Sequence, residues 1–123
     1  MASVNTDIAQ TLDITCRRGD SFSLTLNFKQ SDGTTSLNIT GYEFEMEVRS
    51  TEDDEGTPVI SKTDADIVIV DASAGQVSVT ITDDIMADIF GDSYVYDIQA
   101  ISSAGLTTTW VTGSFTVNED ITI

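Results

Sequence analysis

Apolar and polar side chains alternate over much of this chain. Residues 22–28 place their large apolar side chains at even positions only, and residues 42–48 alternate large apolar side chains with glutamates. Residues 12–16 and 77–81, and the closing hairpin over 94–117, show the same alternation. A period of two means that each strand buries one face and exposes the other. The pattern therefore predicts β-structure along most of the chain.

Three other segments carry different signals. Residues 67–70 form an apolar run too short for a helix, which predicts a strand. Residues 58–62 predict a short edge strand, because Pro58 cannot donate a ladder hydrogen bond but is acceptable where a strand begins. Over 83–90 the apolar residues follow helical spacing, with Thr82 or Asp83 as the N-cap and Gly91 as the end.

The expected organisation is a flexible N-terminal arm over 1–10, one β-domain over 11–117 and a C-terminal tail over 118–123. About seven or eight strands spaced roughly ten residues apart favour an all-β, two-sheet antiparallel sandwich. A closed small barrel is the alternative architecture. The 123 residues suit a single domain.

Charge narrows the choice of partner. The net charge is −16, from 21 acidic and 5 basic residues. Binding to nucleic acid needs clustered Lys and Arg, and anionic membrane surfaces attract the same residues, so both partners are disfavoured. The first residues show no secretory signal, and we expect the protein to remain where it is synthesised unless assembly or lysis carries it out.

Several motifs suggest chemistry, and each has a simpler interpretation. Cys16 has no histidine partner anywhere in the chain, so we expect a small apolar residue rather than a nucleophile. Arg18-Gly19-Asp20 spells the tripeptide that integrins bind, but the same residues make an ordinary hairpin turn. Asn38-Ile39-Thr40 is a glycosylation sequon, which carries no weight without a secretory signal.

Acidic and aromatic residues provide the remaining candidates. The loop from Glu52 to Glu55, and the pair Asp83 and Asp84, offer oxygen ligands for calcium, but neither follows EF-hand spacing. We therefore interpret them as solvated charge and expect no metal, cofactor-binding or catalytic residue.

Four aromatic residues form a possible sugar-stacking platform. Tyr94 and Tyr96 share a strand face with apolar residues and are expected in the core, as is Tyr42. Trp110 has the opposite parity from Val111 and is expected on the outer face, as a candidate contact residue.

Six blocks follow one another along the chain: Arg18 to Leu24, Asp32-Gly33, Ile39 to Arg49, Gly75 to Ile81, Tyr94 to Ile98 and Gly113 to Val117. Taken together, these blocks resemble a family of small structural proteins of tailed bacteriophages, similar to the N-terminal domains of baseplate upper proteins and tail-fibre proteins. The resemblance runs from about residue 11 to 117 and lacks the family's proline between Asp32-Gly33 and Thr40-Gly41-Tyr42.

The resemblance implies an immunoglobulin-like sandwich and a place in the virion, assembled in the host cytoplasm. We expect a non-enzymatic virion protein that docks on neighbouring tail, baseplate or neck proteins, with a second copy of itself as a further possible partner. Two alternatives stay open at this point: a capsid decoration (cement) protein, and a carbohydrate-binding host-adhesion module.

Overall fold

The computed structural model describes residues 2–5, 10–30, 34–50, 58–61 and 65–119. These residues form nine strands and one short helix. In chain order the elements are β1 (Ala2–Asn5), β2 (Gln10–Thr11), β3 (Ile14–Arg17), β4 (Phe22–Lys29), β5 (Glu43–Arg49), β6 (Asp66–Asp71), β7 (Gln76–Ile81), α1 (Asp83–Ala87), β8 (Asp92–Ile101) and β9 (Thr107–Asn118).

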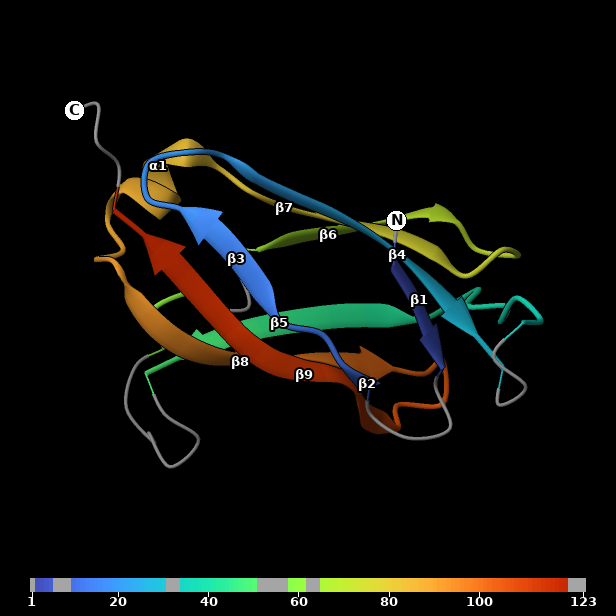
Figure 1. Cartoon of the computed structure of the whole chain (residues 1–123). Helices are drawn as coiled ribbons and strands as arrows, with labels where there is room; N and C mark the ends of the chain where they lie inside the picture. Colours follow the sequence, from blue (N-terminus) through green and yellow to red (C-terminus); the bar gives the residue numbers. More distant parts are fainter. Residues whose placement is uncertain (1, 6–9, 31–33, 51–57, 62–64, 120–123) are drawn as a thin grey trace.

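The strands lie in two facing layers (Figure 1). One sheet has the order β1-β4-β7-β6, and the other has the order β2-β9-β8-β5, with β3 also paired to β9. This is the strand arrangement of immunoglobulin-type sandwiches when β1, β2 and β3 together count as the first strand. The predicted all-β, immunoglobulin-like sandwich with one short helix is therefore confirmed.

The N-terminal segment departs from a wholly antiparallel arrangement. Strand β1 pairs with β4, and β2 and β3 pair with β9, all in parallel register. The segment begins in one sheet and crosses to the other, so that it lines the same side of both layers. Residues 2–5 and residue 10 of the expected arm thus belong to strands. The domain boundaries themselves remain a prediction.

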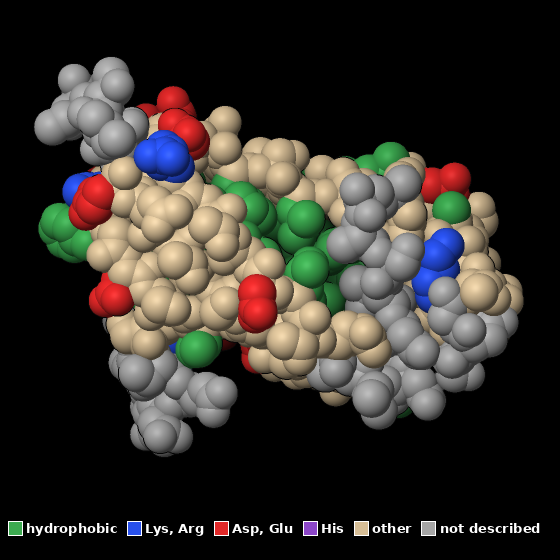
Figure 2. Space-filling model, in the orientation of Figure 1, with side chains coloured by type: hydrophobic (Ala, Val, Ile, Leu, Met, Phe, Trp, Pro, Cys, Tyr) green, Lys and Arg blue, Asp and Glu red, His purple; other side chains and the backbone are tan. Residues whose placement is uncertain are grey.

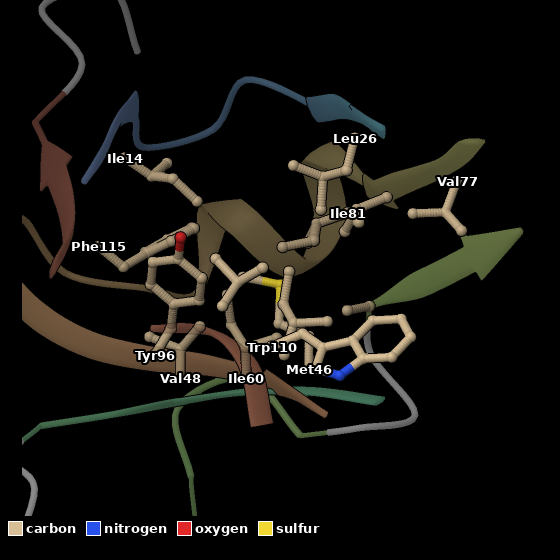
Figure 3. Packing of buried hydrophobic residues seen from close by; sticks show 14 of the residues in the cluster. Ile14, Leu26, Met46, Val48, Ile60, Val77, Ile81, Tyr96, Trp110 and Phe115 are labelled. Atoms are coloured by element: carbon tan, nitrogen blue, oxygen red, sulfur yellow. The ribbon is translucent and has the colours of Figure 1, made fainter. Parts of the chain in front are cut away.

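The alternation seen in the sequence has the expected structural consequence. Leu26 and Phe28 of β4, and Met46 and Val48 of β5, have fully buried side chains, while Glu43 is exposed. Strands from both sheets contribute to one core between the layers, part of which is shown in Figure 3. Its fully buried side chains are Phe28, Phe115, Leu26, Ile39, Met46, Ile60, Ile81, Met86, Ile98, Val48 and Val77.

A close contact holds the N-terminal segment against β9 between β2 and β3. The Leu12 amide donates to the Thr112 carbonyl at 2.9 Å, and the Tyr96 hydroxyl donates to the Leu12 carbonyl at 2.5 Å. A Cβ atom at Gly113 would overlap that same Leu12 carbonyl oxygen. Gly113 is needed here because one backbone passes directly over another.

Asp13 adds a second tie at this point. Its Oδ1 accepts hydrogen bonds from the Ser114 amide and the Ser114 hydroxyl, both at 3.1 Å. We call residues 12–13, together with Tyr96, Gly113 and Ser114, the crossover contact.

The connection from β7 to β8 carries a second tyrosine feature. The Tyr94 hydroxyl donates to the Phe90 carbonyl, four residues upstream, at 2.7 Å. A tyrosine near the start of the equivalent strand makes such a bond in immunoglobulin-like domains. The predicted core positions of Tyr94 and Tyr96 are confirmed, with 8% and 3% of their surfaces exposed. Tyr42 is half-buried against the core.

The expected outer position of Trp110 is wrong, because its side chain is only 6% exposed. The register of β8 against β9 shifts between Ile98 and Gln99, and Trp110 is the residue left without a partner. Such a β-bulge changes which face later residues occupy. Trp110 and Val111 are therefore both buried, and Figure 3 shows the indole beside Met46.

Two shorter elements differ from expectation at their ends. Helix α1 follows the N-cap Thr82 as predicted, but it ends at Asp88 rather than at Gly91. Residues 58–61 contribute an isolated bridge, Val48 to Ile60, in place of the predicted edge strand. Pro58 supplies no donor, and the hydrogen bonds found there run from Val59 and Ile60 to Val48 and back.

We expect Gly113→Ala to destabilise the sandwich by about 1–3 kcal/mol, because the added methyl forces the Leu12 backbone away from β9. Amide hydrogen exchange should accelerate at Leu12 and Ser114. Gly105→Ala is the control: Gly105 has φ +85 but open space around it, so it reports backbone strain alone. Equal protection of Leu12 in both variants would contradict the proposed close contact.

Candidate functional site

The charged groups of the described segments lie on the surface. No polar or charged residue in these segments is buried, and no three His, Cys, Asp or Glu side chains among them gather where a metal ion would fit. No helix of the described chain is long and apolar enough to cross a bilayer. Two surface regions nevertheless bring together polar groups from distant parts of the sequence.

The first region, the outer-face depression, lies on the solvent side of the five-stranded sheet and has a volume of about 440 Å³. Hydroxyl groups of Thr and Ser line one part of it, and charged side chains of β5 and β8 line the other. The residues that line it are Thr11, Glu47, Arg49, Val95, Tyr96, Asp97, Thr112, Gly113 and Ser114.

Two carboxylates face each other within this depression. Glu47 of β5 lies directly opposite Asp97 of β8, so their side chains lie on the same face of the sheet. Burial raises the pKa of Asp97, the negative charge of Glu47 raises it further, and Arg49 opposes the change. Arg49 also forms an ion pair with Glu47 at 3.5 Å.

This arrangement is suited to hydrogen bonding rather than to catalysis. A glycosidase acid needs a raised pKa, a partner carboxylate and a cleft that holds the sugar. Asp97 and Glu47 satisfy the first two requirements, but the depression is shallow and Arg49 already engages Glu47. Sequence reasoning missed this pair, because only the register of β5 against β8 brings Glu47 and Asp97 together.

The second region, the Arg18 clasp, lies at the end of the sandwich that carries α1 and the last residues of β9 (Figure 1). The Arg18 guanidinium donates from Nε to the Ala87 carbonyl at 2.9 Å and from Nη1 to the Glu119 carboxylate at 3.2 Å. Its central carbon lies 4.7 Å from the centre of the exposed Phe90 ring. The other Glu119 oxygen accepts from the Gly91 amide at 3.0 Å.

The clasp therefore joins the β3–β4 turn, the end of α1 and the end of β9. The Gly91 amide, followed by Arg18, lowers the pKa of the Glu119 carboxyl. Figure 2 shows cationic and anionic side chains gathered at this end, and a stripe of hydrophobic side chains along the middle of the same face.

The Arg18-Gly19-Asp20 motif forms the turn that we expected. Gly19 has φ +84, and the Asp20 amide donates to the Arg17 carbonyl at 3.3 Å. Because Arg18 bonds to Ala87 and Glu119, its charge is already paired within the clasp. It does not project from the turn as a separate charge that a receptor for this tripeptide could bind.

Cys16 behaves as a partly buried apolar residue. Its thiol lies against the core and donates to the Thr116 carbonyl at 3.6 Å, and burial raises its pKa to about 11. A raised pKa keeps the thiol protonated, which opposes nucleophilic reactivity. Arg17 and Arg18 lie nearby in sequence, but Arg18 is committed to the clasp.

The other motif residues lie apart from both regions. Asn38 is exposed, and its side-chain oxygen accepts hydrogen bonds from the Thr40 amide and hydroxyl, which is a local turn. Asp83 and Asp84 occupy the first turn of α1, where carboxylates stabilise a helix N-terminus. The acidic loop from Glu52 to Glu55 lies outside the described residues.

The aromatic platform is not present on the surface in the form we expected. Trp110 packs inward against Phe28, Tyr42 and Phe44, with ring centres 5.0, 5.4 and 5.9 Å away. Phe28 and Phe44 are also stacked at 5.3 Å. This cluster fills one end of the core, and it leaves no exposed indole for stacking on a sugar.

These features define the class of protein: an immunoglobulin-like β-sandwich of two facing sheets with one short helix. Residues 2–89 match the family described as the BppU N-terminal domain. The chain belongs to this family, the N-terminal domains of phage baseplate upper proteins. It is therefore a structural component of the phage baseplate and hence of the virion.

Solved structures give the same fold. The chain is similar to the N-terminal domain of phage TP901-1 ORF48, with a TM-score of 0.59 and 14% identity over 96% of this chain and 99% of that one. It also resembles part of a family 123 glycoside hydrolase from Clostridium perfringens, with a TM-score of 0.57 and 13% identity over 92% of this chain but 23% of the hydrolase. At such identities the likeness concerns the fold alone. No curated protein matches the sequence.

We expect Asp97→Asn to stabilise the protein at neutral pH. Because the folded-state pKa of Asp97 is raised, the folded protein binds a proton more readily than the unfolded chain does. The free energy of unfolding therefore falls as pH rises from the ordinary carboxyl pKa through the raised one. Urea unfolding should show a gain at neutral pH that disappears in acid.

Glu43→Gln is the matched control for Asp97→Asn. It removes one negative charge from the same sheet face, but Glu43 is exposed and lies opposite Ile101 rather than another acid. A gain for Asp97→Asn no larger than that of Glu43→Gln would show that burial and Glu47 do not penalise the Asp97 charge.

We expect Arg18→Ala to lower the free energy of unfolding by about 1 kcal/mol, because it removes a charged hydrogen bond to Ala87 and the contact with Phe90. Arg17→Ala removes the same charge from the adjacent exposed residue and should have a smaller effect. Urea unfolding measures both. Equal losses would mean that the clasp adds nothing beyond net charge.

Proposed function

We propose that this chain is a non-enzymatic structural protein of a tailed-phage virion, which docks on neighbouring tail, baseplate or neck proteins through its strand edges and its ends. The observation that carries the proposal is the family match over residues 2–89, on a sandwich whose two sheets end in border strands. Sheets that end in uncovered strands offer backbone groups to a partner strand.

Charge supports a protein partner. At a net charge of −16, contact with nucleic acid or with an anionic membrane is repulsive over most of the surface. A neighbouring virion protein with a basic surface would relieve the repulsion among the acidic residues of this chain. Attraction between the opposite charges would also speed the association of the two proteins. A second copy of the chain is the less favoured partner, since both surfaces carry the same sign.

The two alternatives draw less support from the molecule. Carbohydrate adhesion depended on an exposed Trp110, whose ring is buried. Capsid decoration has no feature in the described residues that favours it over the baseplate. In the proposed function, the polar outer-face depression is a surface that contacts another protein.

Cryo-electron microscopy of the phage particle that contains this chain tests the proposal. We expect its density in the baseplate, in contact with at least one other protein. Copies on the icosahedral shell would instead support capsid decoration and overturn the docking proposal. A glycan array probed with the purified protein completes the test, because specific sugar binding would favour the adhesion alternative.

A further inference from the structure

Strand β6 forms one border of the four-stranded sheet and differs in composition from the strands beside it. Its partner is β7, and no other described strand pairs with its far edge. Residues 67–70 are all Ile or Val, flanked by Asp66 and Asp71. Continuous apolar runs are typical of strands covered on both faces, whereas a border strand normally carries charge or proline as protection.

The outward side chains of β6 make the contrast clear. Val68 and Val70 are 52% and 58% exposed. At the same face of the neighbouring strands β7 and β4 the chain places polar residues instead: Gln76, Ser78, Thr80, Ser23, Thr25, Asn27 and Lys29. On this face of β4, β7 and β6, the exposed large apolar side chains in the described part of the chain are those of β6, a border strand of the sheet.

The inward side chains of β6 line a groove between the two sheets. Ile67 and Ile69 are half-buried, and together with Tyr42 and Phe44 they border a groove of about 440 Å³. Glu43 and Glu45 of β5 complete its lining. The groove therefore combines apolar and aromatic walls with carboxylates at the rim.

We propose that β6 accepts an extended segment of a neighbouring virion protein as an additional strand, and that this segment carries Lys or Arg beside its apolar residues. This inference deepens the proposed function and rests on it. An added strand would pair with the edge of β6 that no described strand occupies, and would place alternate side chains beside Val68 on one face and towards the groove on the other. The β-bulge that leaves Val70 without a partner on β7 marks one end of the regular part of this edge.

The charges select this occupant over a second copy of the chain. Asp66 and Asp71 flank the apolar run, and Glu43 and Glu45 border the groove. Another β6 would bring its own aspartates against these groups at a chain charge of −16. Basic side chains instead pair with the carboxylates, and their aliphatic stems and cationic heads also suit the ring faces of Tyr42 and Phe44.

Three synthetic peptides and the full chain test the inference. The first is a blocked heptapeptide in which Val and Thr alternate between two Lys residues. The second carries Glu in place of both Lys residues, and the third has Pro in place of the central Val. Each is titrated into isotope-labelled protein while backbone amide resonances are followed by NMR.

The Lys peptide should perturb amides of β6 and of residues 42–45. The Glu peptide should bind roughly tenfold more weakly, because it brings like charges together. The Pro peptide should not bind, because proline removes a ladder donor. Equal binding of all three peptides, perturbations confined to other strands, or no binding at all would overturn the inference.

Variants of the protein separate the contribution of the apolar side chains of β6 to peptide binding from the contribution of the nearby carboxylates. Val68→Thr combined with Val70→Thr keeps β-branched side chains on β6 and should weaken Lys-peptide binding several-fold without loss of the folded spectrum. Glu43→Lys should weaken it further, whereas Asp84→Lys makes the same charge change on α1 and should leave it unchanged. Equal effects of Glu43→Lys and Asp84→Lys would contradict a local charge contact.

Failure of strand addition at β6 can be distinguished from failure of the proposed docking function. If microscopy places the chain in the baseplate but no peptide binds at β6, docking stands and strand addition at β6 is overturned. If the Lys peptide binds at β6 but the chain lies on the capsid shell, strand addition stands and docking in the baseplate fails.

Discussion

The passage of the Leu12 backbone over Gly113 is the constraint on which the rest of the sandwich depends. The N-terminal segment pairs with β4 of one sheet and then with β9 of the other, and beyond that crossing β2, Leu12 and β3 keep its backbone groups bonded to β9. The absence of a side chain at Gly113 lets the Leu12 carbonyl approach β9 and accept the Tyr96 hydroxyl. Without that acceptor, a hydroxyl on a residue only 3% exposed would lose its partner, at about 1–3 kcal/mol.

This crossing makes the two sides of the sandwich unequal. One segment lines β4 and β9 together and so covers an edge of each sheet. On the opposite side, β5 and β6 end their sheets, and part of β5 is covered by the bridge from Ile60 to Val48. The border strand β6 is thus the edge that exposes large apolar side chains in the described part of the sandwich, which is the kind of surface that a neighbour can cover. The fold thus connects to an attachment role through its edges rather than through a pocket.

The apolar core stabilises the fold, whereas the charged residues lie on the surface. The described core contains no buried polar residue, so hydrophobic packing between the layers holds the fold. The acidic surface works against the compact state, and the opposed pair Glu47 and Asp97 is a local example of that repulsion. The Arg18 clasp and the pair of Arg49 with Glu47 offset part of this repulsion. In an assembled particle, basic neighbours are the natural source of compensation.

Period-two alternation was enough to place β4, β5, β7 and β8, because which face a strand residue occupies depends on its immediate neighbours in sequence. The succession of family blocks was enough to indicate the immunoglobulin-like arrangement. The alternation predicted the wrong face for Trp110, because one extra residue in β9 shifts the neighbouring residues of the strand to the opposite face of the sheet. Arg18 and Glu119 are separated by 101 positions, and Glu47 meets Asp97 only through strand register. Contacts of this kind arise from how the sheets are joined in space, and local patterns of hydrophobicity contain no information about that joining.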